Sequence, residues 1–284
     1  MSAGGGPEGL LLVDKPSGMT SHDVVDVLRR RLGTRKVGHA GTLDPMATGL
    51  LLVGAGRATR LLRFLGELPK TYQGTARLGI ETDTLDAQGR VLRTAQVDVA
   101  RPELEAAIAG LVGDSLQRPP AYSAVKVGGR KLYQAARRGQ RLEAPPRPIH
   151  VARFELTRYE PPDWDFLVRC SGGTYVRALA SEVGSAVGPG AHLVRLVRTA
   201  IGPFLLRDAA PPERATPQPI ERAVSHLPRL ELGPEEARAA GHGSILGPAG
   251  MEGPYGVYGP GGELIGVWRD DGAKARPEVV LAGG

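Results

Sequence analysis

The chain has 284 residues, which is enough for one large domain or for a large domain followed by a small one. Its hydrophobic content of 41% can build a substantial core, and no stretch approaches the roughly 18 apolar residues that a membrane-spanning helix needs. The formal net charge is +6, carried mainly by arginine, and this balance suits a polyanionic partner such as a nucleic acid.

A single cysteine, Cys170, excludes an internal disulfide and favours a reducing compartment, so a cytoplasmic location is expected. Cys170 lies in an apolar segment, where a buried structural thiol is expected rather than a nucleophile. Residues 1–8 are rich in glycine and lack the basic and then apolar pattern of a signal peptide, so they are predicted to form a disordered tail.

Hydrophobic patterning predicts interleaved strands and helices. Thr20 is typical of a helix N-cap, Asp23 completes a capping box, and Gly33 is typical of a helix end. Alternation of inward and outward positions over residues 71–78 indicates a strand. The other elements expected, in chain order, are strands over 10–13 and 50–53, helices over 58–65 and 102–111, a strand pair over 151–159 and 164–170, a helix from 176, strands over 191–199 and 204–206, a helix over 234–240, and strands over 256–258 and 264–268.

These strands and helices do not follow a steady βαβ rhythm, so a mixed α/β sheet is favoured over a doubly wound parallel sheet. The composition changes near Pro228, and glycine-punctuated strand candidates follow a short helix. The sequence therefore predicts a large domain over residues 9–228 and a small β domain over residues 229–284.

The most informative segment is residues 38–51, GHAGTLDPMATGLL, which places one carboxylate in a loop of small residues. That carboxylate is Asp44, and Pro45 disfavours helical backbone before it, so Asp44 is expected to be extended rather than wound into a turn. The apolar run that follows indicates a site mounted on a strand. Most Asp-Pro pairs are ordinary turns with an Asx hydrogen bond, and the segment by itself leaves both interpretations open.

This segment and several others, in order along the chain, resemble motifs of the TruB family of bacterial tRNA pseudouridine-55 synthases. The other matching segments are KPSGMTS at 15–21, KTYQGTARLG at 70–79, YSAVK at 122–126 and CSGGTYVR at 170–177. The resemblance implies the pseudouridine synthase fold, a curved and largely antiparallel sheet with flanking helices whose cleft holds the active site. The residues after 228 resemble a small RNA-binding PUA domain.

The resemblance also implies the reaction, the isomerisation of uridine 55 in the T-arm of tRNA to pseudouridine. The C1′–N1 bond breaks, the uracil turns while bound and a C1′–C5 bond forms, so no cofactor and no metal are expected. Asp44 is the implied catalytic carboxylate. It attacks the sugar, attacks the uracil ring or removes the C2′ proton, and the sequence leaves these routes open.

Two further catalytic residues are implied by the resemblance. Burial alone would raise the pKa of Asp44, so a nearby cation is needed, and Arg177 is the implied partner. Tyr72 is expected to stack on the extruded base, a contact worth roughly 1–3 kcal/mol, and to handle a proton at C5 through its hydroxyl. The structural alternatives are a surface arginine at a helix start and a plain core tyrosine.

The resemblance implies four substrate-binding residues. Tyr175 is assigned to the uracil pocket, and Leu196 to its apolar floor. His39 is expected to enter the RNA and fill the space that the flipped uridine leaves. Lys15 is expected to contact phosphate or to support the catalytic loop. Each has an ordinary alternative, such as a core leucine, a histidine bonded to backbone or a solvated lysine.

The expected partner is the T-arm stem-loop of tRNA, recognised by its shape and phosphates, with no membrane, no obligate protein partner and a monomeric state. The basic pairs at 35–36 and 137–138 are weaker candidates for phosphate contacts. Three rival functions are a guide-directed synthase in a multi-protein complex, a non-catalytic RNA-binding protein and a nucleoside hydrolase. The short C-terminal region disfavours the first, the catalytic-type residues disfavour the second, and release of free uracil would mark the third.

Overall fold

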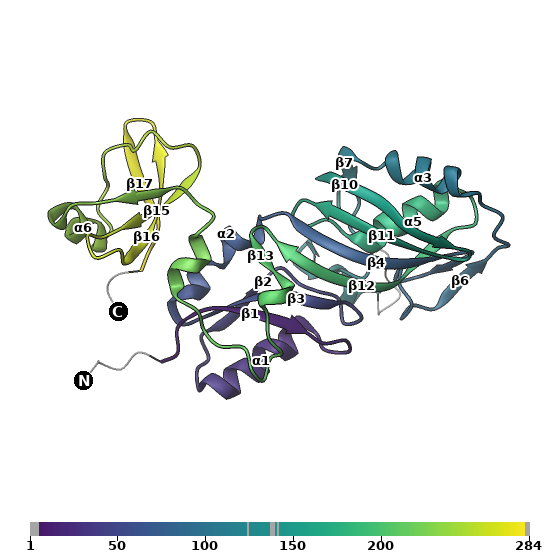
Figure 1. The fold of residues 1–284 in the computed structure, drawn as a ribbon, viewed down its shortest axis with the longest axis horizontal. Helices are drawn as coiled ribbons and strands as arrows, with labels where there is room; N and C mark the ends of the chain where they lie inside the picture. The colour runs from purple at the N-terminus through teal and green to yellow at the C-terminus, as the bar shows by residue number, and fades with distance from the viewer. Residues whose placement is uncertain (1–5, 124, 137–139, 141, 282–284) are drawn as a thin grey trace.

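The computed structural model describes residues 6–281 apart from residues 124, 137–139 and 141 (Figure 1). Its elements, in chain order, are β1 Gly9–Lys15, α1 Ser21–Leu32, β2 Val37–Ala40, β3 Thr48–Ala55, η1 Gly56–Leu61, α2 Leu62–Gly66, β4 Lys70–Leu78, β5 Ile80–Thr82, β6 Val91–Thr94, α3 Arg101–Ala109, β7 Gly113–Gln117, β8 Lys126–Val127, β9 Arg130–Lys131, α4 Leu132–Ala136, β10 Arg147–Glu160, β11 Asp163–Cys170, α5 Val176–Ala186, β12 Ala191–Ile201, β13 Phe204–Leu205, η2 Leu206–Asp208, η3 Ile220–Val224, β14 Arg229–Glu231, α6 Pro234–Gly241, β15 Pro254–Tyr258, β16 Leu264–Asp271 and β17 Lys274–Val280, where η marks a 3₁₀ helix.

One large sheet runs in the order β1-β3-β12-β4-β11-β10-β7, with β2 paired to β3 and β13 paired to β12. The pairings are antiparallel except at the seam between β3 and β12, where Val197 lies opposite Thr48 and Arg198 opposite Gly49 in parallel register. The prediction of a mixed α/β fold built on a largely antiparallel sheet is confirmed. The seam matters for the site because the loop that carries Asp44 leads directly into β3.

The strands β1 and β3 are buried on both faces, which explains their continuous apolar runs. One face packs against α2, η3 and the C-terminal strands, and the other packs against α1. Alternate residues supply the two faces: Leu10, Leu12, Leu50 and Leu52 on the first, and Leu11, Val13, Leu51 and Val53 on the second.

Helix α1 begins and ends where the sequence predicts. The Thr20 hydroxyl accepts a hydrogen bond from the Asp23 amide, and the Asp23 carboxylate accepts one from the Thr20 amide. Gly33 ends the helix in the left-handed conformation at φ 63°. Val24 and Leu28 then face β1 and β3 in the core.

The central strands carry an alternating pattern with one buried face. Inward residues of β4, β11 and β12 form a core with α3 and α5, and this core includes Trp164 and Phe166. Figure 1 shows α3 and α5 together at the end of the sheet away from the C-terminal unit. Cys170 belongs to this core and is buried, as predicted for a structural thiol.

Some predicted elements differ from the structure. The helix predicted over 58–65 is a 3₁₀ helix, Gly56–Leu61, followed by α2, because short helical segments often begin with 3₁₀ turns. A turn over Pro45 and Met46 follows Asp44 directly, since the Asp44 carbonyl accepts the Ala47 amide at 3.0 Å, and extended backbone at Asp44 itself stays a prediction. Pro45 suits the second position of such a turn.

The C-terminal unit is a small sheet in the order β14-β15-β16-β17 with α6 beside it, and it stands at one end of the large sheet (Figure 1). The strand β17 was not predicted because Pro277 breaks its pattern. Proline is tolerated there because β17 is an edge strand. Tyr258, Leu264 and Val279 share a core cluster with Leu10 of the large unit, so the two units bury apolar surface against each other.

The predicted disordered tail falls mostly on residues 1–5, which lie outside the described residues. Glu8, at its end, pairs with Arg57 through carboxylate and guanidinium atoms 2.6 Å apart. Within the described part of the chain, no helix combines the length and the apolar character that a membrane crossing requires.

We predict that Gly49→Ala is much more destabilising than Gly113→Ala. Both glycines have positive φ, 100° and 107°, where a side chain costs about 1–3 kcal/mol. A Cβ at Gly49 would also lie 2.4 Å from the Arg198 carbonyl oxygen at the parallel seam, whereas a Cβ at Gly113 would meet no atom within 4 Å. Urea unfolding of both variants measures the difference, and equal losses would show that the seam can open to admit a methyl group.

Candidate active site

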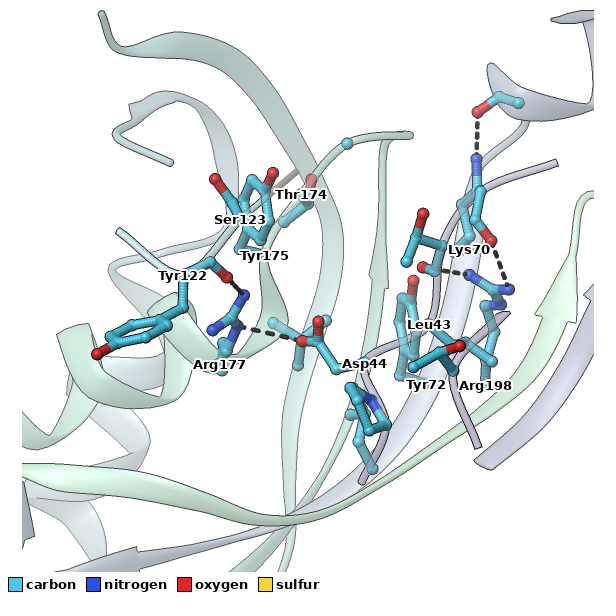
Figure 2. A pocket seen from close by; sticks show the side chains of 18 residues that line it. Leu43, Asp44, Lys70, Tyr72, Tyr122, Ser123, Thr174, Tyr175, Arg177 and Arg198 are labelled. Atoms are coloured by element: carbon cyan, nitrogen blue, oxygen red, sulfur yellow. Dashed lines mark hydrogen bonds and ion pairs between the residues drawn. The ribbon is translucent and has the colours of Figure 1, made fainter. Parts of the chain in front are cut away.

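A cavity of about 470 Å³ opens where the loop 41–45, β4, β12 and the start of α5 meet (Figure 2). Of the seven site residues predicted from the sequence, the five that line it are Asp44, Tyr72, Tyr175, Leu196 and Arg177. His39 and Lys15 do not line it. The cavity therefore gathers residues from segments separated by more than a hundred positions in the chain.

Asp44 and Arg177 form an ion pair, with Oδ2 and Nε 3.1 Å apart. The Arg177 side chain is 4% exposed, whereas the Asp44 side chain keeps 38% exposure toward the cavity. Burial raises the pKa of Asp44, Arg177 and Lys15 act to lower it, and nearby Asp86 raises it further. The expected cation is in place, and the alternative of a surface arginine is wrong.

The Arg177 guanidinium is held by two backbone carbonyls as well as by the carboxylate. Its Nη1 donates to the Thr84 carbonyl at 2.9 Å and its Nη2 to the Tyr122 carbonyl at 2.6 Å. These contacts fix the plane of the guanidinium and leave Nε facing Asp44, as Figure 2 shows. A buried arginine without acceptors would be costly; here both Nη atoms have carbonyl acceptors, and Nε lies at ion-pair distance from the Asp44 carboxylate.

The start of α5 is fixed by Gln117 at the end of β7. The Gln117 side-chain oxygen accepts the Tyr175 amide at 2.8 Å, and its side-chain nitrogen donates to the Tyr175 carbonyl at 3.2 Å. Gln117 is 3% exposed. Because Tyr175 directly precedes the helix that carries Arg177, this reciprocal pair positions both residues relative to the sheet.

The loop that carries Asp44 is held by hydrogen bonds along its length. Ser21 Oγ accepts the Leu43 amide at 2.9 Å and donates to the Leu43 carbonyl at 3.2 Å. The Pro45 carbonyl accepts the Gly18 amide at 2.8 Å and Lys15 Nζ at 3.4 Å. These hydrogen bonds fix the loop and give Asp44 a defined position at the cavity.

Arg198 holds the other side of the same loop. Its Nε donates to the Leu50 carbonyl at 2.7 Å, its Nη2 to Gly41 at 3.1 Å and its Nη1 to Thr42 at 3.5 Å. Arg198 is 1% exposed and lies near the hydroxyl of Tyr72. Burial raises the pKa of that hydroxyl, while the arginine acts in the opposite direction.

Lys15 and His39 lie away from the cavity wall. Lys15 is fully buried and also donates to the carbonyls of Pro16 and Met19, at 3.0 and 2.6 Å, so the geometry favours its loop-supporting role over a phosphate contact. His39 is in β2 rather than in a loop, and its ring lies edge-on to His22 with centroids 6.0 Å apart. Burial lowers the pKa of His39.

Two cations of the cavity wall, Lys70 and Arg198, were not predicted from the sequence. A signal for both was present. Lys70 lies two residues before Tyr72 on β4, and Arg198 two residues after Leu196 on β12, so each shares the inward phase of its strand. A charged residue on the inward phase marks a site. The basic residues at 137–138 lie outside the described residues, and Arg35 and Lys36 are exposed.

The chain matches two protein-family models. Residues 29–176 match the N-terminal domain of the TruB family pseudouridylate synthases, and residues 227–282 match the model described as tRNA pseudouridine synthase II, C terminal. The second match coincides with the small β unit. Whether that unit is a PUA domain stays a prediction.

Curated relatives match over nearly the whole chain. A protein of Mycolicibacterium paratuberculosis named tRNA pseudouridine synthase B is 45% identical, over 97% of this chain and 98% of its own length. A protein of the same name from Thermobifida fusca is 42% identical, over 97% and 99%. Among solved structures, a Cbf5-Nop10-Gar1 complex contains a chain with a TM-score of 0.75 and 26% identity, covering 96% of this chain and 84% of that one.

The fold and the site thus define a pseudouridine synthase, with a mixed, largely antiparallel sheet and an aspartate paired with an arginine at a cavity. The chain belongs to the TruB family of these isomerases. The resemblance noted in the sequence is therefore confirmed at the level of the family.

We predict that Arg177→Met raises the pKa of Asp44, because it removes the main group that stabilises the charged carboxylate. Carboxyl ¹³C NMR of aspartate-labelled protein measures the pKa, with Asp44→Asn assigning the signal. The matched control is Arg77→Met, which breaks the surface pair with Asp163, 2.6 Å long. Arg77→Met should raise the pKa of Asp163 and leave the pKa of Asp44 unchanged. An unchanged pKa of Asp44 in Arg177→Met would contradict the pairing.

Proposed function

We propose that this chain isomerises uridine 55 in the T-arm of tRNA to pseudouridine, with Asp44 as the essential carboxylate and the target uridine extruded into the cavity. The observation that carries the proposal is the Asp44–Arg177 pair at the cavity, which sets one carboxylate against a permanent cation. The relatives named tRNA pseudouridine synthase B support tRNA as the substrate.

The reaction needs one carboxylate, since the leaving uracil can carry negative charge on its own oxygens. The C1′–N1 bond breaks, the uracil turns about in the cavity, C5 bonds to C1′, and the C5 proton is lost while N1 gains one. Water must not reach C1′, because its attack would release uracil and leave an abasic site. Closure of the cavity by bound RNA provides that exclusion.

Asp44 must be ionised for each route that the sequence left open. Attack on the sugar, attack on the uracil ring and removal of the C2′ proton all use the carboxylate as a nucleophile or base. Arg177 keeps that charged form accessible in a desolvated site. Hydrogen bonds to the carbonyls of Thr84 and Tyr122 hold the guanidinium in place, so its position does not depend on bound substrate.

The walls of the cavity suit a flipped base. Tyr72 is an aromatic surface beside Asp44, and Tyr175 and Leu196 also line the cavity (Figure 2). Extrusion of a base costs a few kcal/mol, and stacking on an aromatic ring returns roughly 1–3 kcal/mol of it. His39 is the proposed residue that enters the RNA, and an Ala variant at that position would test it.

A guide-directed synthase is the nearest alternative, since the similar Cbf5 structures are complexes with Nop10, and one of them also contains Gar1. The near-complete overlap with relatives named for tRNA favours direct tRNA recognition. We further propose a cytoplasmic monomer without an obligate protein partner. The β unit after residue 228 is proposed to add RNA affinity. Its strands share an apolar core with β1, so removing the unit would change the stability of the large unit as well as the RNA affinity.

We predict that Asp44→Asn abolishes pseudouridine formation, with a rate loss of at least about 10³-fold, because the amide keeps the shape and loses the charge. The assay maps pseudouridine in an unmodified tRNA transcript after incubation with each protein. Far-UV circular dichroism and thermal unfolding confirm that the variant is folded. An active Asp44→Asn protein, or release of free uracil by the wild type, would overturn the proposal.

We predict that Tyr72→Phe binds the transcript about as well as the wild type but forms little product. The ring keeps its stacking surface, while the hydroxyl that handles the C5 proton is lost. Filter binding gives the affinity, and single-turnover assays give the rate. Normal product formation by Tyr72→Phe would restrict Tyr72 to stacking.

A further inference from the structure

Two buried cations form the wall of the cavity opposite Arg177, and the mechanism above does not use their charge. Lys70 is 4% exposed and Arg198 is 1% exposed, and both line the cavity. In Figure 2 they lie on one side of Asp44 and Arg177 lies on the other. A Cβ at Gly41 would be 3.8 Å from Arg198 Nη1 and 3.9 Å from Lys70 Cε, so the two side chains are close neighbours.

Neither cation has a carboxylate within salt-bridge distance among the residues that the structure describes. Two adjacent positive charges in a desolvated wall are unfavourable without a counter-charge. Burial, together with the nearby charge of Arg198, lowers the pKa of Lys70 to about 8. A bound anion would relieve this cost, because it supplies the negative charge that the protein omits.

The hydrogen bonds show which of the two cations is available. The donors of Arg198 are directed at the carbonyls of Leu50, Gly41 and Thr42, so this side chain positions the loop. Lys70 Nζ donates to the Gly66 carbonyl, and within the described residues its other two N–H groups have no acceptor. Lys70 is therefore the cation with donors left for a ligand.

The backbone beside Lys70 leaves room for a ligand to approach. A Cβ at Gly172 would lie 3.0 Å from Lys70 Nζ, whereas a Cβ at Gly173 would meet no atom within 4 Å. Gly173 lines the cavity and has φ 86°, which any other residue would adopt only with strain. The loop thus presents backbone, without side chains, next to an ammonium group.

We propose that Lys70 binds the phosphodiester group next to the extruded uridine, so that the ribose is drawn over Asp44. This proposal rests on the proposed function, because it assumes an RNA with a flipped nucleotide. A phosphodiester carries a full permanent charge, and lysine is a common point-charge ligand for it. The uracil carries negative charge only while its bond to C1′ is broken, so it would not compensate the cations in the bound ground state.

The test compares Lys70→Met with Lys15→Met in a background of Asp44→Asn, which prevents turnover during binding. Both lysines are buried, but Lys15 donates hydrogen bonds to three carbonyls and does not line the cavity. The ligand is an unmodified T-arm stem-loop RNA, titrated at several salt concentrations. A second RNA carries an uncharged methylphosphonate at each linkage flanking the target uridine in turn.

We predict that Lys70→Met weakens RNA binding about tenfold and reduces the slope of log K against log salt by about 0.7–0.9. Lys15→Met should leave that slope unchanged. One methylphosphonate should weaken binding to the Lys70 protein by a similar factor and should not weaken binding to Lys70→Met any further. The first part of this result is measured on the unaltered lysine, so a lack of any methylphosphonate effect would contradict the proposal even if Lys70→Met folds poorly.

Two outcomes would overturn the proposal. Additive losses from the methylphosphonate and from Lys70→Met would mean that the phosphate contacts another residue. Unchanged affinity and slope with a reduced single-turnover rate, measured in proteins that retain Asp44, would assign Lys70 to the departing uracil instead. Failure of the proposed function would be seen separately, as a wild-type protein that makes no pseudouridine in an RNA that it binds.

Discussion

The structure depends on keeping one carboxylate charged at a place that disfavours charge. Burial and the neighbouring Asp86 raise the pKa of Asp44, and the fixed guanidinium of Arg177 opposes them. A buried ion pair roughly breaks even in folding free energy against an apolar pair of the same size. The pair therefore adds little to stability, and its value lies in chemistry. Its cation is held by carbonyls of Thr84 and Tyr122, so the charge of Asp44 relies on segments distant in the chain.

The rest of the fold supplies the rigidity that this arrangement needs. The strand β3 is buried on both faces and paired on both edges, so the loop that precedes it starts from a fixed point. At the parallel seam, Gly49 lets β12 approach closely, and Arg198 then reaches across to the loop carbonyls. A site on a loop is usually less precise than a site on a strand. Here the loop gains precision from side chains that lie in the sheet and in α1.

Much of the fold and the centre of the site could be predicted from the sequence, because local patterns carried them. The capping box at Thr20, the alternation of β4 and the apolar runs of β1 and β3 all appear as expected. What could not be predicted depended on tertiary context. The turn at Asp44 is set by hydrogen bonds from α1 and β1, and β17 pairs despite its proline because it lies at an edge. Lys70 directly precedes the strand predicted over 71–78, and its role required knowing which face of that strand lines the cavity.

The buried cations connect the stability of the free protein to the nature of its substrate. Lys70 and Arg198 lie together in a wall that has no acidic partner among the described residues, so the protein itself does not balance their positive charge. A free nucleoside would fill the cavity but bring no charge to that wall. A nucleotide within an RNA chain carries a phosphate close to its ribose. In the proposed complex that phosphate balances the positive charge of Lys70 and Arg198 and places C1′ beside Asp44. If Lys70 binds a phosphodiester as proposed, selectivity for polymeric RNA over free nucleosides begins inside the cavity.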